Sequence, residues 1–142
     1  MYYGLSQQLN NNMKEQFVPY EIALKLKEKG FDEPCLGYFD PLYEQLVIWE
    51  NGNTNSTSNW VYAPLWQQAI DWFEDKFNMK FSIAYWNGYN YSLPKAMQYK
   101  YEVYIIPKNG SSITVRDNEE RCFFDTRKDA IVAAIIKALT LI

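Results

Sequence analysis

The chain contains no histidine among its 142 residues and only two cysteines, Cys35 and Cys122. Histidine is the side chain that most often performs general acid–base catalysis at neutral pH, so its absence weighs against that chemistry. The two cysteines are far apart in the sequence, and neither has a second cysteine nearby. A zinc site of the Cys/His kind therefore cannot be assembled, and we expect neither a metal nor a cofactor.

A thiol nucleophile would need a base or a helix N-terminus to lower its pKa. Cys35 precedes an apolar segment and Cys122 precedes two phenylalanines, so we interpret both as small core residues. The six glycines are scattered, which leaves no glycine-rich phosphate loop. We interpret the acidic pairs as solvated charges on a polar helix face or in a turn; they are Asp71/Asp75, Glu74/Asp75 and Glu119/Glu120. The sequence thus predicts that the protein is not an enzyme.

The chain also lacks a run of 18 apolar residues, so the sequence predicts no membrane span. Its first residues show neither the basic nor the apolar region of a secretory signal, and we expect a cytoplasmic location. The formal net charge is −3. Nucleic-acid binding calls for clustered lysine and arginine, so we regard a nucleic-acid partner as disfavoured.

Aromatic residues, by contrast, are abundant: the chain has 12 tyrosines, 8 phenylalanines and 5 tryptophans. One explanation is a small core built largely from rings, because aromatic side chains bury a large apolar area. The other explanation is that some of these rings form a binding surface. The sequence alone leaves both explanations open.

A central amphipathic helix is predicted between Ala63 and Asn78, with Pro64 in its first turn. Its apolar arc consists of Leu65, Trp66, Ala69, Ile70, Trp72, Phe73 and Phe77. Such an arc is wide enough to cover a sheet. We therefore expect this helix to contribute much of the core.

Two further helices flank it in the sequence. The first spans Tyr20 to Lys29 and is followed by Gly30, which can cap its C-terminus at positive φ. The last begins after Thr126, with Asp129 in a capping-box position, and continues to Ile142. This last helix is apolar nearly all round, which indicates burial on several sides or a subunit interface. A homo-oligomer formed through it is therefore a further expectation.

Short strands are predicted at Cys35–Phe39, Leu46–Trp49, Lys80–Trp86, Met97–Ile106, Ser111–Arg116 and Arg121–Phe124. The third and fourth alternate with one cleaner apolar face, and Asn109-Gly110 is a hairpin signal after the fourth. The predicted fold is α+β: an antiparallel sheet of about four to six short strands with three helices packed mainly on one face. Residues 1–16 are interpreted as a polar tail, and residues 17–142 as a single domain.

Three segments together resemble a family of small proteins of gut Bacteroidetes, their prophages and their phages. Residues 17–35 read FVPYEIALKLKEKGFDEPC and residues 62–73 read YAPLWQQAIDWF. The third segment is the F-x-T-x-x-x-A pattern of Phe124, Thr126 and Ala130. The resemblance covers most of the chain from Phe17 onward. It implies a phage or mobile-element origin and a bacterial cytoplasm, but that family has no assigned activity and supplies no catalytic residues.

The most suggestive candidate site is the stretch from Tyr85 to Tyr91, YWNGYNY. Tyrosine, tryptophan, asparagine and glycine are typical of adaptable recognition loops. Trp86, Tyr89 and Tyr91 are the candidate partner-binding residues, although the same rings could instead cover a sheet edge. The leading hypothesis is a small non-enzymatic protein that acts on a host or phage protein. The alternative is a small-ligand or single-stranded nucleic-acid binding module that stacks its ligand on these rings.

Overall fold

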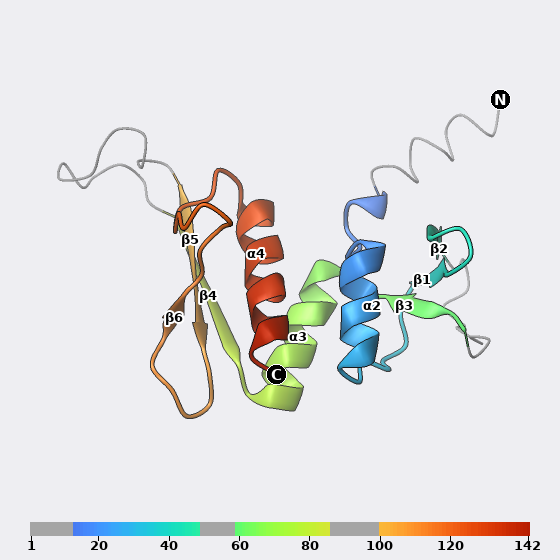
Figure 1. The fold of residues 1–142 in the computed structure, drawn as a ribbon, viewed down its shortest axis with the longest axis horizontal. Coiled ribbons are helices and arrows are strands. Elements are labelled where there is room, and N and C mark those ends of the chain that lie inside the picture. Colours follow the sequence, from blue (N-terminus) through green and yellow to red (C-terminus); the bar gives the residue numbers. More distant parts are fainter. Residues whose placement is uncertain (1–12, 49–58, 86–99) are drawn as a thin grey trace. The chain divides into compact units, whose positions relative to one another are not determined.

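The computed structural model describes residues 13–48, 59–85 and 100–142. In this described part, three helices and six short antiparallel strands confirm the α+β class (Figure 1). The chain divides into two compact units, Met1–Ala69 and Ile70–Ile142. The interpretation of residues 17–142 as one domain stays a prediction.

The first unit contains a three-stranded sheet in the order β2-β1-β3. Its strands are β1 (Gly37–Asp40), β2 (Gln45–Ile48) and β3 (Val61–Ala63). Helix α2 (Tyr20–Glu28) lies against β3, and the Tyr20 ring meets the Phe39 ring edge-on at a centroid distance of 5.6 Å. The sequence prediction had missed β3, which is only three residues long but composed of strand-forming residues.

Helix α2 ends as the sequence predicts. Gly30 adopts a φ of +95°, a conformation that costs a glycine little. Its N–H donates to the Lys27 carbonyl at 3.0 Å, and the N–H of Phe31 donates to the Leu26 carbonyl at 2.9 Å. These two bonds form a Schellman motif, which satisfies carbonyls left without a partner at the end of the helix.

Helix α3 (Trp66–Phe77) begins three residues after the predicted start at Ala63. Pro64 therefore precedes the helix, and its carbonyl accepts a hydrogen bond from the N–H of Val18 at 2.9 Å. In the part of α3 that belongs to the second unit, Trp72 is exposed to 2% and Phe73 is fully buried. The predicted apolar arc is thus buried at its centre, whereas Leu65, Trp66 and Phe77 are half-buried.

The second unit contains the sheet β4-β5-β6, formed by β4 (Lys80–Tyr85), β5 (Tyr101–Ile106) and β6 (Ile113–Thr114). The register pairs Phe81 with Ile105 and Ile83 with Val103, so the residues predicted to share an apolar face do share it. Helix α4 (Arg127–Thr140) packs against β5 and β4 (Figure 1).

The strands differ from the prediction in two respects. They form two sheets of three strands rather than one sheet, with α2 against the first sheet and α4 against the second. Residues 121–124 do not form a strand, because only Phe124 pairs with β5, in an isolated bridge to Tyr101. The segment instead bulges away from the sheet between β6 and this bridge. Among the described residues, no helix is long and apolar enough to cross a membrane.

Candidate functional site

A tight loop built on Asp117 forms one wall of a groove in the second unit. One carboxylate oxygen of Asp117, Oδ1, accepts from the backbone N–H groups of Glu119 and Arg121, both at 2.9 Å. The other oxygen, Oδ2, accepts from Arg121 Nε at 2.7 Å. The Arg121 N–H, helped by the guanidinium and the Glu119 N–H, holds the pKa of Asp117 below its usual value. The short side chain of one aspartate thus fixes the path of the loop.

Both ends of this loop are attached to β5. Before the loop, the N–H of Val115 donates to the Val103 carbonyl at 3.0 Å. After it, Phe124 and Tyr101 exchange two backbone hydrogen bonds of 2.8 Å. Beyond that bridge, Lys100 forms an ion pair with Asp125. The segment from residue 115 to residue 125 is therefore held at both ends and at its middle.

Helix α4 forms the opposite wall and, through its accessible apolar residues, the floor of the groove. Thr126 caps its N-terminus, since the Thr126 hydroxyl accepts from the N–H of Asp129 at 3.0 Å, as the sequence predicts. One face of the helix is buried and consists of Ala130, Ile131, Ala134, Ile135, Ala138 and Leu139. A second apolar face remains accessible: Val132 and Ala133 are half-buried, and Ile136 is exposed to 47%. The helix therefore has more apolar surface than its own unit covers.

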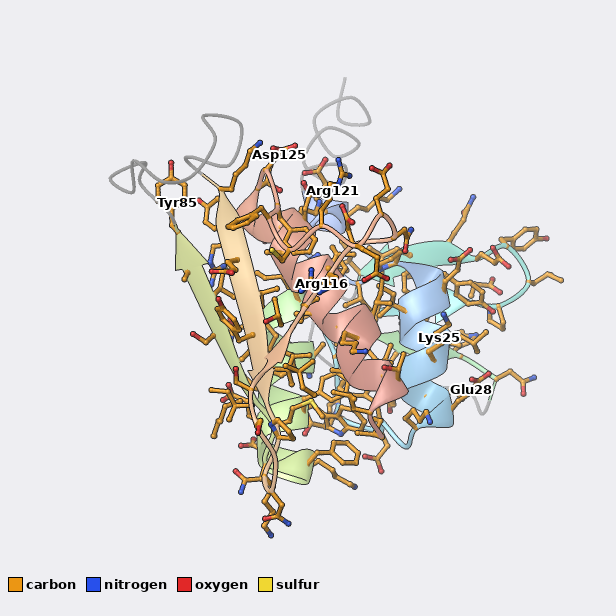
Figure 2. All side chains as sticks on the ribbon, turned by 60° about the vertical axis from the view of Figure 1, so that its left-hand side comes forward. Lys25, Glu28, Tyr85, Arg116, Arg121 and Asp125 are labelled. Carbon is orange, nitrogen blue, oxygen red and sulfur yellow. The ribbon has the colours of Figure 1, made fainter. Side chains whose placement is uncertain are left out.

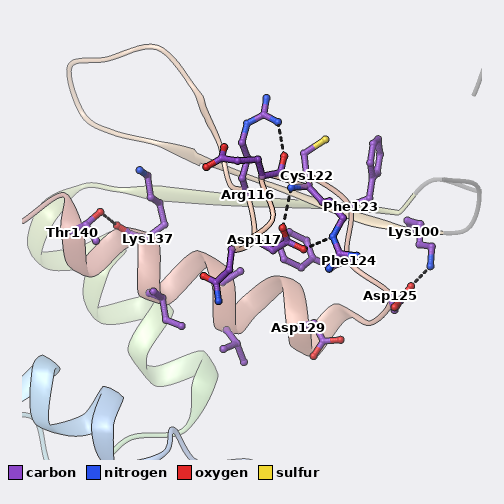
Figure 3. A pocket seen from close by; sticks show the side chains of 16 residues that line it. Lys100, Arg116, Asp117, Cys122, Phe123, Phe124, Asp125, Asp129, Lys137 and Thr140 are labelled. Carbon is purple, nitrogen blue, oxygen red and sulfur yellow. Dashed lines mark hydrogen bonds and ion pairs between the residues drawn. The ribbon is translucent and has the colours of Figure 1, made fainter. Parts of the chain in front are cut away.

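Between the two walls lies a groove of about 930 Å³ (Figure 3). Its size is at the upper end of the range for ligand cavities, roughly 300–1,000 Å³. Val132, Ala133 and Ile136 form the apolar floor. Charges of both signs surround the floor: Lys100, Arg116, Arg121 and Lys137 are basic, and Asp117, Glu120, Asp125 and Asp129 are acidic.

Most of the basic groups at the groove are already engaged. Arg121 pairs with Asp117 and with Glu119, the latter at 3.4 Å, and Arg116 Nη1 donates to the Glu120 carbonyl at 3.1 Å. Figure 2 shows Arg116, Arg121 and Asp125 along the segment that passes over α4. Since the charges are balanced and largely paired, the groove does not form a phosphate-binding cluster of the kind that nucleic-acid binding requires.

The two thiols differ in their surroundings. Cys35, in the first unit, is buried as predicted, and burial raises the pKa of its thiol to about 12. Its Sγ donates to the Glu33 carbonyl at 3.3 Å. Cys122 is only half-buried and lines the groove, so the prediction that it is a core residue is wrong. The bulge of the loop between residues 116 and 124 is what removes it from the sheet.

We expect a small maleimide to label Cys122 in the native protein much faster than Cys35. At pH 8, a thiol with a pKa of about 12 is almost entirely protonated, and only the thiolate reacts. Peptide mass spectrometry after timed quenching measures the two rates. The rates should become similar in denaturant, and similar rates in the native state would contradict the assignment.

A hydrogen-bonded pair on the opposite face of the second sheet was not foreseen from the sequence. Glu102, exposed to only 7%, accepts from the Tyr104 hydroxyl, and this bond is the main cause that raises the Tyr104 pKa to about 12. The strand alternation places both residues on the face of β5 opposite to that of Val103 and Ile105. With its proton held, Tyr104 is not a base at neutral pH, so we interpret the pair as structural.

Most of the remaining sequence candidates lie either on exposed positions or outside the described residues. The carboxylates of Asp71 and Asp75 lie on exposed positions of α3, as do those of Glu119 and Glu120 in the loop. In residues 13–48, 59–85 and 100–142, no three potential metal ligands are grouped. Trp86, Tyr89 and Tyr91 lie outside the described residues, so their role stays a prediction. Tyr85, just before them, is exposed to 53%, and its ring packs 4.9 Å from that of Tyr101.

The sequence thus did not predict the groove, but it predicted the uncovered helix face that forms one of its sides. The nearly continuous apolar character of α4 predicted an uncovered face, whereas nothing local indicated that residues 116–125 would lie across from it. Comparisons with protein families, with curated proteins and with solved structures found no match.

Proposed function

We propose that this protein acts by binding another protein through the groove between α4 and residues 116–125, and that it catalyses no reaction. The observation that supports this most directly is Ile136, whose side chain is exposed to 47% on the floor of that groove. Apolar surface surrounded by polar and charged groups is typical of protein interaction sites.

The charges of the groove favour a protein over other ligands. Its rim has acidic and basic side chains in equal number, four of each, and several already pair with one another. A protein surface can match such a mixed pattern, whereas a phosphate-rich polymer would need an excess of basic groups. The net charge of −3 likewise disfavours a phosphate-rich polymer as the ligand.

The lack of histidine and the burial of Cys35 favour a binding role. The chain has no histidine, and the pKa of the buried Cys35 thiol is far above neutrality. The resemblance to proteins of Bacteroidetes phages and prophages suggests a bacterial cytoplasm and a host or phage protein as the partner. This location and this kind of partner are part of the proposal.

The test is affinity capture with a pair of matched variants. Ile136→Glu introduces a charge on the groove floor, and Leu36→Glu makes the same change at a side chain exposed to 52% in the other unit. Losing a central interface residue typically costs 2 kcal/mol or more, so Ile136→Glu should reduce partner recovery about thirtyfold. Leu36→Glu should leave recovery unchanged.

Quantitative mass spectrometry of the captured proteins gives the comparison, with circular dichroism to confirm that both variants fold. Equal recovery by the wild type and by Ile136→Glu would refute the proposal. Loss of partners in the Leu36→Glu variant would place the interaction surface on the other unit.

A further inference from the structure

The charges on the groove face of α4 have a regular arrangement. Asp129 lies near the start of the helix and Lys137 eight residues later, and both line the groove (Figure 3). At a rise of 1.5 Å per residue they are about 12 Å apart along the axis. No ion pair joins either side chain to another residue in the described part of the chain. Between them lie the apolar residues Val132, Ala133 and Ile136.

This arrangement is complementary to itself. When two such helices run antiparallel about a two-fold axis at Ala133, Asp129 of each copy lies at the same height along the helix axis as Lys137 of the other. The three apolar residues then meet in the middle, and the small side chain of Ala133 at the centre allows the helices to approach closely. From this pattern we infer that the groove binds the α4 helix of a second copy of this chain.

The size of the groove agrees with a helix as its occupant. A helix about 10 Å in diameter fills roughly 80 Å³ per ångström of length, so a segment about 12 Å long occupies roughly 1,000 Å³. The groove measures about 930 Å³. The groove is thus large enough to receive a short stretch of helix.

The charges also select the direction of pairing. A parallel pair would place Asp129 near Asp129 and Lys137 near Lys137, and like charges across an interface are unfavourable. This inference rests on the proposed function, since it takes the same groove as the interaction surface, but it names a second copy of this chain as the partner in place of a host or phage protein. A different protein as the partner is the main competing outcome of the test.

The test reverses the charges singly and together. Asp129→Lys and Lys137→Glu each place two like-charged pairs across the two-fold axis, so each variant should weaken self-association at least about tenfold. The double variant Asp129→Lys/Lys137→Glu restores opposite charges at both contacts and should associate like the wild type. An equimolar mixture of the two single variants should form the mixed dimer. Sedimentation velocity measures the association, and native mass spectrometry identifies the mixed species.

Arg127→Glu serves as the matched control, because it makes the same charge change at an exposed position of α4 that does not line the groove. Melting curves confirm that each variant folds, since a lysine near the helix N-terminus weakens the helix slightly. Recovery of association in the double variant supports the inference, because a different protein partner would still meet reversed charges.

Two outcomes overturn the inference. A chain that stays monomeric at high micromolar concentration would exclude the second copy as the partner; if Ile136→Glu still loses captured proteins, the proposed function survives. A dimer that is indifferent to all three charge variants would exclude the antiparallel α4 pairing. If, in addition to the monomeric state, Ile136→Glu loses no captured protein, then the proposed function fails as well.

Discussion

Replacing Phe73 by alanine should lower the free energy of unfolding by about 3–5 kcal/mol. Phe73 is fully buried in the second unit. Its ring centroid lies 5.0 Å from that of Trp72 and 6.0 Å from that of Phe81 on β4. The alanine variant would lose the burial of the ring and leave a cavity between α3 and the sheet, and the rings around it could fill that cavity only in part.

Phe77→Ala is the matched control, because it removes the same side chain from the same helix at a half-buried position. Its ring contacts Trp72 at a centroid distance of 5.1 Å, so some loss is expected, but clearly less than at Phe73. Urea denaturation followed by circular dichroism gives both values. Equal losses would mean that Phe73 does not have the central place in the core that its burial indicates.

The local features of this chain could be predicted because they depend on neighbouring residues. Gly30 ends α2 since it alone of the nearby residues reaches a φ of +95° without strain. Thr126 begins α4 because its hydroxyl meets the N–H of Asp129 three residues later. The alternation of Phe81, Ile83 and Tyr85 places these residues on one face of β4 whatever the sheet around it.

The division of the strands into two sheets could not be predicted in the same way. Strand pairing joins residues far apart in the sequence, and each predicted strand has an apolar face that fits either sheet equally well. β1 pairs on one side with β2 through a short turn, but its other neighbour, β3, follows more than 20 residues after β1. Periodicity within a strand contains no information about such a partner.

The groove depends both on local sequence features and on contacts between residues that are far apart in the sequence. Its helical wall follows from the composition of α4, in which only Lys137 and Thr140 interrupt the apolar residues after Asp129. Its other wall requires two contacts. Asp117 must bind Arg121 through both the backbone and the side chain, and Phe124 must pair with Tyr101 on β5. The sequence predicted a strand at Arg121–Phe124 and did not predict this bulge, because a bulge held by one aspartate has no periodic signature.

The two neighbouring isoleucines of α4 provide the second large effect. Ile135 is fully buried on the face that packs against the second sheet, so Ile135→Ala should cost about 2–5 kcal/mol of unfolding free energy. Ile136→Ala removes the same atoms one position later, where the side chain is exposed to 47%, and should change stability by less than about 1 kcal/mol. Alanine is also the better helix former, which offsets part of that small loss.

The two variants should separate stability from association. Ile135→Ala should melt several degrees lower but, below its melting temperature, still self-associate, because the groove face of α4 is unchanged. Ile136→Ala should melt close to the wild type at low micromolar concentration and yet associate more weakly, because Ile136 lies on the groove floor. Thermal melts and sedimentation on the same samples test both statements. A large loss of stability in Ile136→Ala, or a small one in Ile135→Ala, would show that the helix presents a different face to the sheet.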